Sequence, residues 1–110
     1  MLFYPFNEQG HAGVQQLNAE RDNETNRLMY EVQSLARERG PKAWALFLEM
    51  QGAGNDQWEA LTAKVDEASN VPSEESFRAY QAYSYALYVL TVAQCEQQLA
   101  ALNALPWDKP

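Results

Sequence analysis

The stretch FRAYQAYSYALYVLTVAQCEQQLAALNAL, Phe77–Leu105, decides the fold of this chain, because it is too apolar to be an exposed helix. It contains four tyrosines within nine residues. The run from Ala79 to Cys95 carries no charge, and its 17 residues approach the shortest span of a bilayer. Glutamine, serine and threonine interrupt the run, and its flanks are acidic rather than basic. We therefore predict a buried helix in a globular protein and no membrane span.

The apolar residues of this helix form two stripes. The first has the alternating spacing of three and four that is typical of a coiled-coil seam, and the second follows the same spacing on another face. The first stripe consists of Tyr85, Tyr88, Val92, Cys95, Leu99 and Leu102, and the second of Tyr80, Tyr83, Leu87 and Leu90. A helix that is apolar on both sides must be covered on both sides.

Two arrangements would cover both stripes. In one, a second copy of the chain packs on the seam and forms a homodimer; this is the interpretation we favour from the sequence. In the other, the chain is a monomeric bundle with this helix at its centre. The predicted dimer or partner seam consists of Tyr85, Tyr88, Val92, Leu99 and Leu102.

Turn signals divide the rest of the chain into further helices. Gly40 followed by Pro41 is typical of one helix ending and another beginning. The segment QGAGND (51–56) predicts a second break, because its two glycines favour a flexible turn. Ser73 is a good N-cap for the last helix, which we expect to cover about residues 74–105. No segment shows the alternation of a strand, so we predict an all-α, four-helix-type bundle.

The two ends of the chain are predicted to lie outside the helices. The first helix is expected from about Val14 to Arg39, with a charged middle, NAERDNETNR (18–27), that offers only one alanine to a core. Pro5 is unsuited to a helix interior, so residues 1–12 are predicted to form an extended arm whose aromatic residues cross a helical groove. Residues 106–110 form a tail, and the length of the chain predicts one domain over residues 1–110.

Charge narrows the possible partners. The 15 acidic and 8 basic residues give a net charge of −7, which argues against direct nucleic-acid binding. The acids concentrate after residue 55, where they form either a solubilising surface or a patch that attracts a basic protein. The predicted acidic patch consists of Asp56, Glu59, Asp66, Glu67, Glu74 and Glu75.

Catalytic and metal-binding patterns are not found. The chain has one histidine, His11, and one cysteine, Cys95, with no motif around either, so we predict no enzyme, no metal site and no cofactor. Cys95 lies on the apolar seam and is expected to act as a small buried side chain. A lone cysteine and the lack of a signal-like N-terminus favour a cytoplasmic location.

The three tryptophans are predicted to play different parts. Trp44 and Trp58 lie in apolar stripes and are expected in the core, whereas Trp107 follows the last helix and is a possible anchor for a partner. These features favour a small acidic regulator or inhibitor that binds a larger protein with a basic, nucleic-acid-binding surface. The alternatives are an assembly component built through the tyrosine-rich helix, and a helical bundle that binds a small molecule.

Overall fold

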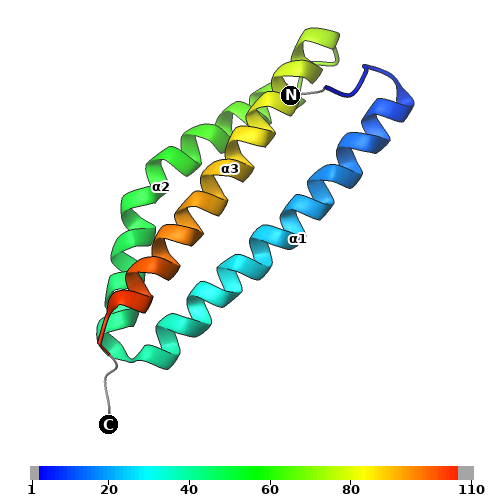
Figure 1. Ribbon diagram of the computed structural model, residues 1–110. Helices are drawn as coiled ribbons and strands as arrows, with labels where there is room; N and C mark the ends of the chain where they lie inside the picture. Colours follow the sequence, from blue (N-terminus) through cyan, green and yellow to red (C-terminus); the bar gives the residue numbers. More distant parts are fainter. Residues whose placement is uncertain (1–2, 107–110) are drawn as a thin grey trace.

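The protein is all-helical, with three long helices in an elongated arrangement (Figure 1). The computed structural model describes residues 3–106. The helices are α1 (Glu8–Arg39), α2 (Pro41–Ser69) and α3 (Glu74–Ala104), and no strand occurs among the residues that it describes. The molecule measures 57 × 23 × 19 Å, and each helix packs against the other two.

The predicted fourth helix is wrong, because α2 continues without a break through Gly52 and Gly54. Glycine inside a helix costs only about 1 kcal/mol, and packing elsewhere along α2 outweighs that cost. Gly54 also serves the contact with α3. The side-chain amide of Gln94 donates to the Gly54 carbonyl at 3.0 Å, and a Cβ at this position would lie 2.6 Å from the same nitrogen. Gly54 therefore marks a close approach of two helices rather than a turn.

The first helix is a single helix, as predicted, but it begins at Glu8 instead of near Val14. The Asn7 side chain caps it by accepting a hydrogen bond from the Gly10 backbone at 2.7 Å, which is the ordinary chemistry of a helix start. The non-helical arm is therefore shorter than the predicted residues 1–12. The helix is also continuous through its charged middle, where no break occurs.

The arm crosses the end of the bundle in the way the sequence predicted. The backbone of Tyr4 donates to the Gln81 side chain at 2.7 Å and accepts from it at 3.1 Å, so Gln81 of α3 holds the arm by both ends of one residue. Gly10 is buried beneath the arm, and a Cβ there would collide with the carbonyl oxygen of Pro5. The arm thus fixes this end of α1 against α3.

The tightest packing lies at the opposite end, where α1 turns into α2. Its buried residues are Val32, Ala36, Ala43, Phe47, Cys95 and Leu102. The Arg39 guanidinium donates to the Leu105 carbonyl at 3.1 Å and to the Asn103 side chain at 3.3 Å, which links the end of α1 to the end of α3. Gly40 makes the sharp turn with φ 102° and ψ −172°, a conformation open to glycine and costly for other residues.

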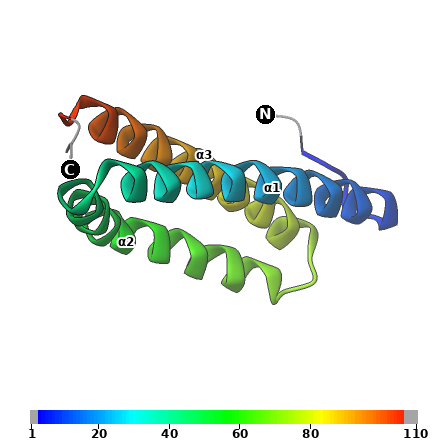
Figure 2. The same ribbon diagram turned by 90° about the horizontal axis from the view of Figure 1, so that it is seen from below.

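A smaller aromatic contact closes the end that carries the arm. The rings of His11 and Phe77 lie 4.4 Å apart between their centroids, and Phe6 packs beside both. Val14 is buried nearby. Figure 2 shows what lies between the two packed ends: α1 and α2 diverge as they leave the Gly40 turn, and α3 runs behind both. The last helix, α3, matches its predicted range and its predicted cap, because the Ser73 hydroxyl accepts from Ser76 at 3.1 Å.

Two glycine substitutions should have opposite effects on stability. Gly40→Ala should lower the free energy of unfolding by about 1–3 kcal/mol, because alanine is strained at this φ. Gly52→Ala should raise it by about 0.5–1 kcal/mol, because its Cβ would meet open space within a continuous helix. Urea unfolding of both variants measures this difference. A destabilised Gly52→Ala protein would mean that α2 bends or breaks at this point, as the sequence alone suggested.

Candidate functional site

A groove between α1 and α2, with α3 as its floor, is the main concave surface of the described chain. It consists of two adjoining hollows of about 220 and 370 Å³. Met29 of α1, Trp58 of α2 and Thr91 of α3 line both hollows, so the two form one continuous surface. The groove occupies the middle of the molecule, between the two packed ends.

The α1 wall explains why the groove stays open. The residues of α1 that line it are Asn18, Arg21, Asp22, Thr25, Asn26 and Met29. All but Met29 are polar, and burying such groups without partners costs more than the contact returns. The same helix packs tightly only further along, where Val32 and Ala36 replace the polar residues. The opening thus follows directly from the segment 18–27, which has almost no apolar residue to offer.

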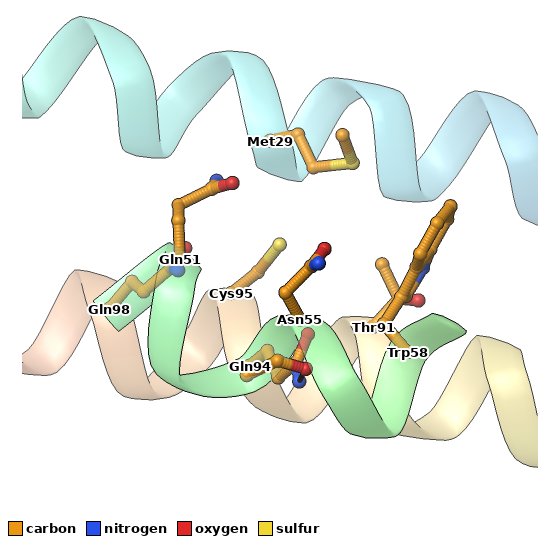
Figure 3. Close-up of a pocket in the computed structure, with 9 residues that line it drawn as sticks. Met29, Gln51, Asn55, Trp58, Thr91, Gln94, Cys95 and Gln98 are labelled. Carbon is orange, nitrogen blue, oxygen red and sulfur yellow. Dashed lines mark hydrogen bonds between the residues drawn. The ribbon is translucent and has the colours of Figure 1, made fainter. Parts of the chain in front are cut away.

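The α2 wall carries the exposed aromatic of the groove. Trp58 was predicted to lie in the core, but it is 40% exposed, because the α1 residues opposite are polar and do not close over it. In Figure 3, Gln51, Asn55 and Trp58 extend from α2 toward α1, and Met29 extends back from α1 toward them. Met29 is itself 38% exposed. Two large apolar side chains therefore face the groove from opposite walls without being covered.

The floor is formed by the face of α3 that lies between its two stripes. Tyr80 accepts a hydrogen bond from the Asn18 side chain at 3.1 Å, which ties the α1 wall to the floor. Cys95 is buried at the other end of the groove. Burial raises the pKa of the Cys95 thiol, and the nearby Glu96 carboxylate adds to this effect. The thiol is therefore protonated at neutral pH and lacks the thiolate that a nucleophile or metal ligand needs.

The predicted seam packs mainly inside the chain. Leu102 is fully buried and Leu99 packs against the same core. Val92 is half-buried, and the Tyr88 hydroxyl donates to a Glu24 carboxylate oxygen on α1 at 2.6 Å. Tyr85 differs, since 43% of it is exposed.

The second stripe faces α2, where the Lys64 ammonium lies 5.3 Å from the centre of the Tyr83 ring. Both stripes thus meet other helices of the same chain, as in the monomeric alternative. The homodimer stays a prediction, and the outward part of α3 open to it includes Tyr85 and Val89, which is 45% exposed.

A cation joins α1 to the exposed end of the seam. The Arg21 guanidinium lies 5.3 Å from the centre of the Tyr85 ring and 5.3 Å from that of Tyr88, close enough to attract both rings. Arg21 also lines the groove. Together with the Tyr88–Glu24 hydrogen bond, this contact holds the middle of α1 to α3 through polar groups instead of an apolar core.

The predicted acidic residues are all exposed, but they face different directions. Glu59 and Asp66 directly follow Trp58 and Val65, two residues that line the groove. The Asn55 side chain, also in the lining, donates to a Glu59 carboxylate oxygen at 2.9 Å and so holds this acid at the rim.

The other four acids lie elsewhere. Asp56 and Glu67 project from the far side of α2, since each is about half a turn away from Trp58 in helical angle. Glu74 and Glu75 lie in the first turn of α3. The predicted patch is therefore divided, and only its Glu59 and Asp66 part adjoins the groove. Trp107 lies outside the described residues.

Comparisons with known proteins add no relative. The chain matches no family model, no curated protein and no solved structure. Within residues 3–106, no cluster of three or more histidine, cysteine, aspartate or glutamate side chains could hold a metal ion. None of the three helices has a stretch long and apolar enough to cross a membrane. The groove, which sequence reasoning missed, is thus the candidate functional site on geometric grounds.

Tyr88→Phe should lower stability and change how stability depends on pH. The hydrogen bond to Glu24, with burial second, raises the pKa of Tyr88 above 10.0. A group with a raised pKa in the folded state stabilises the protein fully below its unfolded pKa and loses this contribution as pH rises through the folded pKa. Near neutral pH the variant should therefore lose about 1 kcal/mol, and the difference from the parent should shrink above pH 10.

Urea unfolding of both proteins across this pH range makes the measurement. Tyr30→Phe is the matched control, because Tyr30 is 73% exposed and its hydroxyl has no such partner role to lose. A Tyr88→Phe protein as stable as the parent near neutral pH would show that the Glu24 contact does not hold α1 to α3.

Proposed function

We propose that this protein is a non-enzymatic interaction module that holds a segment of another protein in the groove between α1 and α2. The observation that carries the proposal is the pair Met29 and Trp58, which face each other across the groove while 38% and 40% exposed. Methionine and tryptophan are among the residues enriched at protein interfaces. Facing apolar side chains on separate walls are suited to gripping a side chain inserted between them.

The lining supports binding more than catalysis. Its thiol, Cys95, is buried and protonated at neutral pH. The remaining polar groups are largely amides and hydroxyls, which include Gln51, Asn55 and Thr91. Such groups accept and donate hydrogen bonds to a bound chain, and interfaces typically hold about one hydrogen bond per 100–200 Å².

The acidic balance of the chain suggests the kind of partner. A net charge of −7 favours approach to a basic protein surface, such as one that binds nucleic acid. We therefore propose that the module acts as a small regulator or inhibitor of a larger, nucleic-acid-binding protein, in the cytoplasm. Covering a basic surface would compete with the nucleic acid for it.

A photo-crosslinking residue in place of Met29 should capture a partner protein in the native host. The groove places position 29 beside any segment bound against Trp58. Denaturing gels and mass spectrometry should find an adduct of a defined protein at this position. The matched control is the same residue at Ala60, which is exposed on the far side of α2.

Two results would contradict the proposal. An equal set of adducts at positions 29 and 60 would show contact without use of the groove. A purified parent protein that carries a small molecule in the groove, with no adduct at position 29, would favour the ligand-binding alternative.

A further inference from the structure

The groove has the length and shape of a missing helix. On α3 its lining runs from Tyr80 to Gln98, which corresponds to about 27 Å, or five turns, at 1.5 Å per residue. Two helices form its walls and a third its floor. In a four-helix bundle, the fourth helix lies in this position against three others. The chain itself supplies only three helices within residues 3–106.

The rim of the groove is acidic. Asp22 lines the groove on the α1 wall, and Glu59 and Asp66 lie at its edge on α2. The hydrogen bond from Asn55 fixes the Glu59 carboxylate there. The cation in the lining, Arg21, is turned to the α3 side, where it lies over two tyrosine rings. An occupant with positive charge beside its apolar face would therefore meet acids on both walls.

We propose that the occupant is a basic amphipathic helix of a partner protein, about 18 residues long, that completes a four-helix bundle. Its apolar side chains would fill the space between Met29 and Trp58, and its lysines or arginines would lie along the acidic rim. This inference rests on the proposed function and names the segment that the same groove takes.

A second copy of this chain is a poor occupant on charge grounds. Each helix has a surplus of acids: six acids against four bases in α1, five against two in α2, and three against one in α3. Placing any of them along the acidic rim would bring like charges together, which disfavours association. A basic helix from another protein reverses the sign of this interaction.

The test uses a designed peptide and the full chain. The probe is a fluorescent 18-residue helix with leucines on one face and lysines beside them, and its twin carries glutamate at every lysine. Fluorescence anisotropy should give a Kd for the lysine peptide at least ten times lower than for the glutamate twin. The Kd of the lysine peptide should rise with salt, because the rim contacts are exposed to solvent.

Matched variants of α2 separate the rim from the overall charge. The double variant E59Q/D66N removes an aspartate and a glutamate at the rim, and D56N/E67Q removes the same pair of residue types from the opposite side. The rim variant should raise the Kd about five- to tenfold and flatten its salt dependence, while the opposite-side variant should stay within about twofold of the parent. Trp58→Ala should raise the Kd at every salt concentration.

Each outcome decides something. Equal weakening by the two double variants, or equal binding of the two peptides, would overturn the basic-helix inference, because the attraction would then be diffuse or absent. If position 29 captures a protein while the lysine peptide fails to bind, the inference fails and the proposed function stands. If the peptide binds as expected while position 29 captures nothing in the host, the groove has this chemistry but the proposed function fails. Circular dichroism and melting curves confirm that each variant is folded.

Discussion

The polar middle of α1 is the constraint on which the rest of the structure depends. From Asn18 to Arg27 the helix has almost no apolar side chain, so it cannot close on α2 without burying amides and carboxylates. The chain therefore packs at its two ends and leaves the middle open. The Gly40 turn with its apolar cluster holds one end, and the arm held by Gln81 holds the other. Between them, α1 meets α3 through Arg21, Tyr88 and Glu24.

The central place of α3 follows from its two stripes and from the chain connections. Only this helix is apolar on two faces, and it contacts α1 with one and α2 with the other. A helix of this type supports two neighbours that hardly need to contact each other. That division explains how α1 and α2 can diverge while both remain attached (Figure 2). The open groove is thus a consequence of a helix that packs on two sides, combined with a neighbour that has little to pack.

Much of the fold could be predicted from local chemistry. The all-α class, the turn at Gly40, the start of α3 at Ser73 and the extended aromatic arm all depend on neighbouring residues, and the structure agrees with them. The false break at Gly52 and Gly54 had a different origin. Glycine signals flexibility in a sequence, but here Gly54 lets Gln94 reach the α2 backbone from a residue 40 positions away. No local pattern distinguishes these two uses of glycine.

The candidate site could be predicted only in part, because it is defined by distant segments. The sequence identified the acids and Trp58, but it joined six acids into one patch, whereas helical geometry divides them. It also assigned Trp58 to the core on its stripe alone, without the α1 residues that face it. The segment 18–27 held the missing signal. A long helix with a polar middle must leave its neighbours partly uncovered, and the exposed Met29 and Trp58 lie where that uncovered surface falls.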